Sequence, residues 1–119
     1  SDEFKDISGH WAEKDIYLIA AQGIITGYED GTFRPEQAIT REEMATMLYR
    51  LLKLEYSAAA NKNFSDVGRA DWSYNEITTL AGIGIISGYK DNTFKPGNNL
   101  SRGEMAALIN RVLGYEAGT

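Results

Sequence analysis

Hydrophobic residues recur at helical spacing in two segments of the chain, one after Thr40 and one after Ser101. In both segments they fall at positions i, i+3, i+4, i+7 and i+8, which places them on one face of an amphipathic helix. These residues are Met44, Met47, Leu48, Leu51 and Leu52 in the first segment and Met105, Leu108, Ile109, Val112 and Leu113 in the second. We therefore predict two helices, each contributing this face to a hydrophobic core.

Both predicted helices have a recognisable start. Thr40 and Ser101 are each followed three residues later by a glutamate, Glu43 or Glu104. In this arrangement each of the two side chains accepts a hydrogen bond from the backbone N–H of the other residue. We therefore expect a capping box at each helix start.

A shorter hydrophobic stripe precedes each of these helices. Its residues are Ala12, Ile16, Ile19 and Ala20 in the first case and Ile77, Leu80 and Ala81 in the second. A glycine, Gly23 or Gly84, comes after each stripe and is followed by two isoleucines. This pattern predicts a left-handed C-terminal cap with an apolar residue folded back over the helix. We expect the first of these helices to begin near Trp11.

A turn-forming segment lies between the two helices of each pair, at residues 27–35 and 88–96. In each segment an Asp-Gly or Asp-Asn pair stands between two aromatic residues. Because Gly and Asn tolerate positive φ, the segments are predicted to form a tight turn or a short hairpin.

These elements occur twice because the chain is a tandem repeat. Residues 4–52 align with residues 64–113, and the two tryptophans and the two prolines fall at equivalent positions. The predicted divisions are repeat 1 (1–54), a linker rich in Ala, Ser and Asn (55–63), repeat 2 (64–115) and a tail (116–119). The predicted fold class is all-α, with tandem helix–loop–helix repeats and short turns or hairpins between the helices.

Composition excludes several classes of function. The 119 residues carry a formal charge of −5, which disfavours nucleic acid because phosphate binding requires clustered Lys and Arg. No cysteine is present, so disulfides and thiolate-bound zinc are excluded. No apolar stretch approaches the ~20 residues of a membrane-spanning helix. We expect a soluble chain without membrane insertion, and no secretory signal is recognisable at its start.

Metal binding and catalysis are not expected either. His10 is the only histidine, and Asp30-Gly31-Thr32 lacks the alternating acidic ligands and the final glutamate of a calcium loop. An enzyme of the glycosidase type would need two facing carboxylates. The candidates, Glu43 or Glu104 with Asp6 or Asp66, have structural duties and occur in both copies. We therefore predict no enzyme, no metal and no cofactor.

The motifs of both copies resemble those of S-layer homology repeats. Repeat 1 contains Phe-x-Asp-Ile, His-Trp-Ala, Gly-Ile-Ile-x-Gly-Tyr-x-Asp-Gly-Thr-Phe-x-Pro and Ile-Thr-Arg-Glu-Glu in that order, and the match spans nearly all of residues 4–114. In that family three repeats usually pack around a pseudo-threefold axis and anchor surface proteins to pyruvylated secondary cell-wall polysaccharide. The resemblance implies a secreted, non-catalytic anchor at the cell surface or cell wall (S-layer).

Two departures from the family pattern matter. With only two repeats the chain would form two-thirds of the pseudo-threefold bundle, so we expect self-association, a compact two-repeat form, or a third repeat elsewhere in a longer protein. Repeat 2 also has Asp71-Trp72-Ser73 in place of His-Trp-Ala, and Gly103 where the family favours a helix former. Repeat 2 is therefore expected to bind less well than repeat 1.

Arg41 and Arg102 are the leading candidates for ligand binding. Each stands just inside a predicted helix start, where a guanidinium and free backbone N–H groups together suit a carboxylate. The resemblance implies that a pyruvate ketal supplies that carboxylate. It also places a groove between Arg41 and residues 66–72, so that Arg102 would need a partner from another chain. The alternative interpretation is that each arginine pairs with a nearby acid such as Asp6 or Asp66.

Trp11 and Trp72 have two interpretations, as do Asp6 and Asp66. The tryptophans would either stack on sugar rings or anchor the core at a helix start. The aspartates would either accept hydrogen bonds from sugar hydroxyls or cap the first helix of their repeat. The sequence leaves both questions open.

Gly27, Gly88, Arg34 and Lys95 complete the candidate site. The glycines would either let a sugar approach the backbone or supply the positive φ of a turn. Arg34 and Lys95 are solvated charges by default and additional polymer contacts otherwise. A competing function is protein–protein assembly at the cell surface through the aromatic turns.

Overall fold

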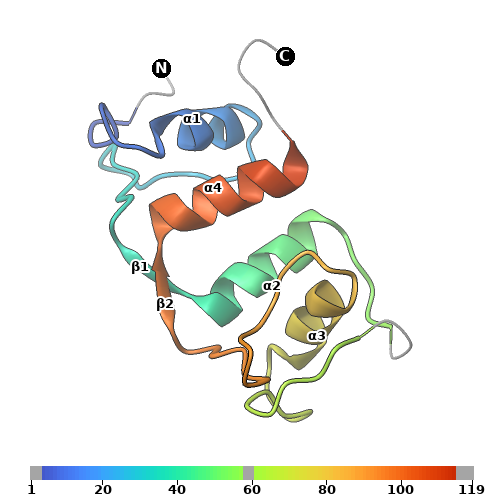
Figure 1. Cartoon of the computed structure of the whole chain (residues 1–119). Coiled ribbons are helices and arrows are strands. Elements are labelled where there is room, and N and C mark those ends of the chain that lie inside the picture. The colour runs from blue at the N-terminus through green and yellow to red at the C-terminus, as the bar shows by residue number, and fades with distance from the viewer. Residues whose placement is uncertain (1–3, 58–60, 115–119) are drawn as a thin grey trace. The chain divides into compact units, whose positions relative to one another are not determined.

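The computed structural model describes residues 4–57 and 61–114 (Figure 1). Its elements, in chain order, are α1 (Glu13–Ala21), β1 (Ala38–Thr40), α2 (Arg41–Leu51), α3 (Tyr74–Gly82), β2 (Asn99–Ser101) and α4 (Arg102–Leu113). The two strands pair in a two-stranded sheet. The all-α prediction is therefore incomplete, because the extended backbone of each capping residue, Thr40 or Ser101, continues backwards into a short strand. The predicted tail and part of the predicted linker lie outside the described residues.

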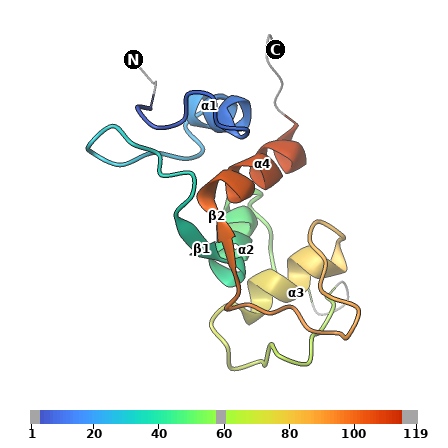
Figure 2. The same ribbon diagram turned by 60° about the vertical axis from the view of Figure 1, so that its left-hand side comes forward.

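The chain folds into two compact units whose limits differ from those of the repeats. Unit 1 combines Ser1–Ile39 with Leu100–Thr119, and unit 2 is Thr40–Asn99. In unit 1, α1 packs against α4, and in unit 2, α3 packs against α2 (Figures 1 and 2). Each unit thus takes its first helix from one repeat and its second helix from the other. The described helices pack as two pairs, one in each unit.

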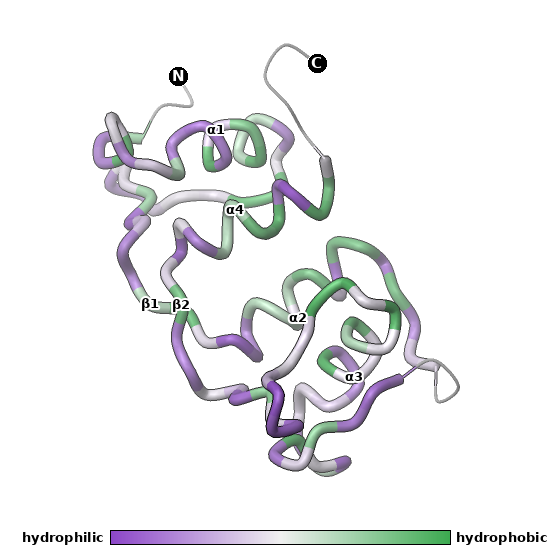
Figure 3. The backbone as a smooth tube through the Cα atoms, viewed as in Figure 1, coloured by the Kyte–Doolittle hydropathy of each residue, from purple (hydrophilic) through white to green (hydrophobic). Residues whose placement is uncertain are grey.

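In each unit the predicted apolar faces of the helices contribute to a hydrophobic core. In Figure 3 hydrophobic and hydrophilic positions alternate along each helix. Core side chains of unit 1 include Ile16, Ile19, Phe33, Met105 and Ile109, and those of unit 2 include Met44, Leu48, Ile77, Leu80 and Phe94. Phe33 and Phe94 are fully buried, and each burial contributes roughly 2–3 kcal/mol. The predicted amphipathic helices are confirmed.

The predicted helix ends are confirmed by their hydrogen bonds. Capping boxes join Thr40 to Glu43 and Ser101 to Glu104. After α1, Gly23 has a φ of 74°, its N–H donates to the Ala20 carbonyl, and the next N–H reaches back to Ile19. The same pattern ends α3 at a second glycine. The paired bonds around a left-handed glycine satisfy carbonyl groups that a helix end leaves free.

The start of α1 differs slightly from the prediction. The helix begins at Glu13, two residues after Trp11, and its first turn is capped without help from the side chain of the N-cap residue, Ala12. Instead, the imidazole Nδ1 of His10 accepts a hydrogen bond from the Ala12 N–H. The tryptophan therefore lies outside the helix.

The predicted turns form in both units. In unit 1 the N–H of Tyr28 donates to the Thr32 carbonyl, and the N–H of Gly31 donates to the Tyr28 carbonyl. Unit 2 repeats both bonds at Tyr89, Thr93 and Asn92. The turn holds an aromatic ring at its entrance and a buried phenylalanine at its exit in each unit.

None of the four helices described is long and apolar enough to cross a membrane.

Candidate carboxylate-binding sites

The start of each second helix is attached to the loop of the other repeat. The N–H groups of Arg41 and Glu42 donate to the carbonyls of Asn98 and Pro96, and Glu43 N–H donates to the Thr40 hydroxyl. In unit 1 the N–H groups at the start of α4 make the same bonds: those of Arg102 and Gly103 donate to loop carbonyls, and that of Glu104 donates to the hydroxyl of its capping residue. The expectation of free backbone N–H groups at these helix starts is therefore wrong, because the loops already use them. An anion at either site would depend on side-chain donors and the helix dipole.

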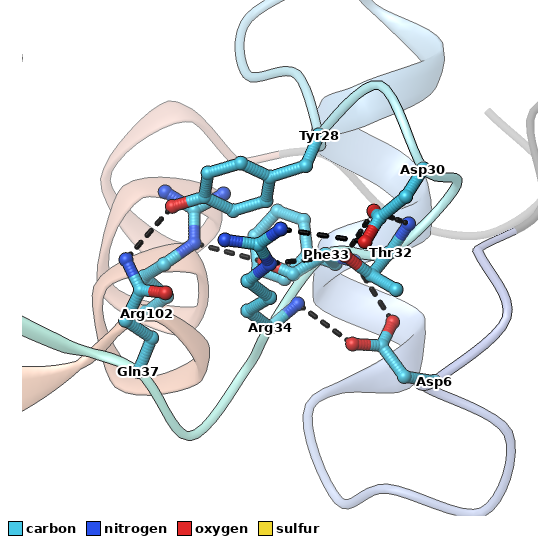
Figure 4. Close-up of polar contacts among 8 residues, drawn as sticks. All are labelled: Asp6, Tyr28, Asp30, Thr32, Phe33, Arg34, Gln37 and Arg102. Atoms are coloured by element: carbon cyan, nitrogen blue, oxygen red, sulfur yellow. Dashed lines mark hydrogen bonds and ion pairs between the residues drawn. The ribbon is translucent and has the colours of Figure 1, made fainter.

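The guanidinium groups are held by backbone carbonyls. Arg41 donates from Nε to the Phe94 carbonyl (2.8 Å) and from Nη2 to the Ser87 carbonyl (3.1 Å). Arg102 donates from Nε to the Phe33 carbonyl (2.9 Å; Figure 4). Its Nη2 donates to the Thr26 carbonyl (3.3 Å). Arginine has five N–H donors, so these bonds orient each group and leave donors for a ligand.

Neither Arg41 nor Arg102 has an acidic partner in the part of the chain that the structure describes. Among the described residues no carboxylate oxygen lies within 4.0 Å of a nitrogen of Arg41 or Arg102, and the ion pairs found there join His10 to Glu36 and Arg34 to Asp30. The interpretation that these arginines pair with Asp6 or Asp66 is therefore wrong. The positive charge of each group remains open to an anion.

Aromatic rings line both guanidinium groups. The guanidinium carbon of Arg102 lies 4.4 Å from the ring centroid of Phe33 and 5.0 Å from that of Tyr28. Burial is the largest effect on the pKa of Arg102 and lowers it. Tyr28 and Asp6 act in the opposite direction, and the Arg34 charge lowers the pKa further. A partly dehydrated cation that has no acidic partner among residues 4–57 and 61–114 favours a bound anion.

A second cation lies at the same tyrosine ring in each unit. The Arg34 guanidinium carbon is 3.7 Å from the Tyr28 centroid, and the group also donates to the Thr32 hydroxyl and to Asp30 (Figure 4). In unit 2, Lys95 Nζ is 4.4 Å from the Tyr89 centroid. Arg34 is exposed, as expected of a solvated charge, and its guanidinium is also held by these neighbours.

Asp6 and Asp66 brace the loops. The two carboxylate oxygens of Asp6 accept hydrogen bonds from the N–H groups of Phe33 and Arg34, both at 2.8 Å. Asp66 binds the N–H groups of Phe94 and Lys95 in the same way. The predicted capping of the first helices is therefore wrong. Each aspartate instead stabilises a loop whose cationic residue has a positive φ, 61° for Arg34 and 57° for Lys95.

Gly27 and Gly88 are required by packing. Neither has a positive φ, so the explanation by turn geometry is wrong. A Cβ at Gly27 would lie 2.3 Å from Cε1 of Phe4 and 2.6 Å from the Thr32 carbonyl oxygen, and Gly88 has the same surroundings. The chain's own atoms fill the space that a side chain would need.

The two tryptophans are on the surface. Trp11 is 62% exposed and Trp72 is 61% exposed, so the interpretation as core anchors is wrong. Both residues are largely exposed to solvent, which sugar stacking would require. Sugar contact itself remains an expectation.

Each unit contains a full set of candidate residues. Unit 1 contains Asp6, Trp11, Gly27, Arg34 and Arg102, and unit 2 contains Asp66, Trp72, Gly88, Lys95 and Arg41. The arginine always comes from the other repeat of the same chain. The reason for expecting a partner chain at Arg102 therefore disappears.

The two departures noted in repeat 2 also lie in different units. Asp71 belongs to unit 2, whereas Gly103 belongs to unit 1. The two departures therefore belong to different candidate sites. The expectation that repeat 2 binds less well cannot be assigned to either site as a whole. Tyr28 and Tyr89 are candidate site residues that the sequence pattern did not single out, although their recurrence at one position in both turns is a signal for them.

The described residues contain no candidate metal centre. Between residues 4–57 and 61–114, no three or more His, Asp or Glu side chains gather as metal ligands would.

Comparison with known proteins agrees with these features. The family model for the S-layer homology domain matches residues 3–45 and 63–106. Cell surface glycoprotein 1 of Acetivibrio thermocellus is 44% identical over 87% of this chain, and the Cellulosome-anchoring protein of the same organism is 40% identical over 92%. The Surface layer protein of Brevibacillus choshinensis is 36% identical over 87%. These names confirm the predicted cell-surface location.

The relatives are much longer than this chain. The aligned part covers 5% of Cell surface glycoprotein 1, 26% of the Cellulosome-anchoring protein and 10% of the Surface layer protein. Exoglucanase XynX of Acetivibrio thermocellus also matches, with 34% identity, and the aligned part covers 10% of it. The segment that is similar to this chain is therefore a minor part of each of these relatives.

Proposed function

Because the chain belongs to the S-layer homology domain family, we propose that it attaches a protein to an anionic polysaccharide of the bacterial cell wall. The bound group in this proposal is the carboxylate of a pyruvate ketal on a secondary cell-wall polysaccharide. One observation carries the proposal: two arginines are oriented by backbone carbonyls and have no acidic partner among the described residues.

Binding would begin with capture of the carboxylate by the guanidinium group. Nε and Nη2 of each arginine hold the loop, so the remaining N–H donors face the ligand, and a charge-assisted pair forms. The start of α2 or α4 adds the positive end of a helix dipole. Trp11 or Trp72, exposed in the same unit, would then stack on a sugar ring and orient the polymer.

The function is non-catalytic in this proposal. Glu43 and Glu104, the carboxylates considered for catalysis, bind the backbone N–H groups of their capping residues. Asp6 and Asp66 bind loop N–H groups. These bonds hold all four carboxylates in the scaffold, so enzymes that match this chain would carry their activity in other parts of their sequences.

The arginines supply the test of the proposal. We expect Arg41→Ala and Arg102→Ala each to weaken binding of a pyruvylated wall polysaccharide by about 1.5–3 kcal/mol at its own site, the range for a hydrogen bond to a charged group. Isothermal titration calorimetry measures this loss, and circular dichroism checks the fold. Arg111→Ala is a matched control because Arg111 is exposed in the last turn of α4. Unchanged affinity in both site variants would assign the arginines to structure alone.

Surface assembly is the second candidate function, favoured by the exposed aromatic residues Trp11, Trp72 and Tyr89. The partner would be a second copy of the chain or a third repeat outside it. Binding to purified sacculi before and after chemical removal of the polysaccharide separates the two functions. Loss of binding on stripping supports anchoring, whereas retained binding, or a concentration-dependent mass in light scattering that Trp11→Ala abolishes, supports assembly.

A further inference from the structure

The two units share a backbone contact at which their side chains differ. The N–H of Gly103, the second residue of α4, donates to the Pro35 carbonyl at 2.8 Å. In unit 2 the N–H of Glu42, the second residue of α2, donates to the Pro96 carbonyl at 3.0 Å. The same position therefore has no side chain in one unit and a glutamate in the other.

In unit 1 a histidine fills the space beside Gly103. A Cβ on Gly103 would lie 3.2 Å from Cε1 of His10 and 3.2 Å from the Pro35 carbonyl oxygen. The imidazole is fixed on both sides, because Nδ1 accepts from the Ala12 N–H and Nε2 is left to donate to the carboxylate of Glu36. A glutamate at position 103 would meet this ring and bring a second carboxylate towards Glu36.

In unit 2 the corresponding loop accepts a glutamate. Ser73, at the position of Ala12, is fully buried, and its hydroxyl donates to Oε1 of Glu42 at 2.9 Å. Asp71 replaces His10, and its carboxylate accepts from the N–H of Gly68 within its own loop. Gly97 replaces Glu36, so no acidic side chain stands at that position. The loop therefore offers a hydroxyl donor to Glu42 and no competing carboxylate at position 97.

We propose that these residues form a pairing code that directs each second helix to the first helix of the other repeat. If each repeat paired with itself, Glu42 would face His10 and Glu36. Gly103 would face Ser73, whose buried hydroxyl would lose its acceptor. Self-pairing is thus disfavoured on both sides, as in interfaces that exclude wrong partners by clash and unpaired polar groups.

The pairing code selects the same partner loop from this chain or from a second copy. A chain that exchanged helices with another copy would still place α4 beside a His10 loop and α2 beside a Ser73 loop. The code would therefore fix which arginine enters which binding site. It rests on packing contacts and stands whether or not the sites bind polysaccharide.

Gly103→Glu in the full chain tests the code. Helix propensity alone favours glutamate over glycine, so propensity predicts that Gly103→Glu raises the stability of the fold. The pairing code predicts that the same substitution lowers it. We expect Gly103→Glu to lower the midpoint of thermal unfolding by about 5 °C or more. Converting the facing loop with His10→Asp, Ala12→Ser and Glu36→Gly should recover most of that loss. The same loop changes combined with Glu42→Gly are the control, because Glu42 lies in unit 2, and their effects should add.

The outcomes are distinct. A higher midpoint for Gly103→Glu, or additive effects of Gly103→Glu and the loop changes, would overturn the pairing code. If Gly103→Glu alone does not fold, the variant that combines it with the loop changes is expected to fold. Failure of that combined variant to fold, when the loop changes alone are tolerated, also overturns the code.

Discussion

Units 1 and 2 have the same backbone scaffold around their arginines but differ in the groups that surround it. In both units the arginine donates to a phenylalanine carbonyl, and an aspartate accepts from the N–H of that phenylalanine and from the N–H of the next residue. In unit 1 the second cation, Arg34, is tied to Thr32 and Asp30, and Gln37 donates to the Tyr28 hydroxyl. In unit 2 the shorter Asn98 stands at the position of Gln37, and Lys95 stands at the position of Arg34.

This difference shows which parts of the site are structural and which are adjustable. The bonds that fold the loop are repeated in both units, so they belong to the scaffold. The second cation is an arginine in unit 1 and a lysine in unit 2, so this position is the natural place for a difference in ligand binding. Tyr89 is 43% exposed, which leaves the ring of unit 2 open to solvent. We expect the site of unit 1 to be the more rigid of the two.

The largest expected effect separates the two units. Phe33→Ala and Phe94→Ala each remove a fully buried ring, at a cost of about 3–5 kcal/mol. Hydrogen exchange measured by NMR should show Phe33→Ala lowering protection in residues 4–39 and 100–114 more than in residues 40–99. Phe94→Ala should do the reverse. Equal loss along the whole chain in both variants would show that the units do not respond separately.

A smaller effect tests the shared scaffold. Asp6→Ala and Asp66→Ala each leave two loop N–H groups without their acceptor, and we expect either change to cost about 1–3 kcal/mol of stability. Urea denaturation measures the loss. The two costs should agree because the two sets of bonds are the same. A large cost in one unit only would contradict a common loop brace.

Exchange of the second cations sharpens the difference between the sites. Arg34→Lys removes the planar group that binds Thr32 and Asp30, and Lys95→Arg introduces one beside Tyr89. We expect affinity for the pyruvylated polysaccharide to change by about 0.5–1 kcal/mol, downwards for Arg34→Lys and upwards for Lys95→Arg. Titration calorimetry with Arg41→Ala or Arg102→Ala in the background isolates each site. Changes of the same sign in both variants would remove the role of the second cation.

The smallest effect is on pH dependence. The Thr32 hydroxyl and N–H lower the pKa of Asp30 from its ordinary value of 3.8, and Thr93 lowers the pKa of Asp91 in the same way. Because the folded-state pKa lies below the unfolded one, this stabilisation is complete above the unfolded pKa and is lost as pH falls through the folded pKa. Between about pH 5 and pH 2, Asp30→Asn should reduce the fall in thermal stability slightly. A steeper fall would contradict these hydrogen bonds.

Several candidate site residues could be identified from the sequence, but their contacts in the folded chain could not. Arg41 and Arg102 were identified from their positions at capped helix starts, and their acceptors turned out to be carbonyls on the other repeat. Asp6 was expected to cap a nearby helix, but it binds Arg34, 28 residues away. A capping role is a local inference, whereas loop bracing depends on how distant segments meet. Gly27 illustrates the same point, because only its contact with Phe4 explains why a side chain is excluded.

The sequence by itself determined the tandem repeat, the capped helices and the left-handed glycine caps, because these depend on contacts within a few residues along the chain. It also determined which faces are apolar. Only the tertiary structure decided which helix packs on which, since the apolar faces of both repeats are similar and hydrophobic burial is not directional. That choice depends on contacts such as Arg102 with Phe33, 69 positions apart. It makes each candidate site a product of both repeats.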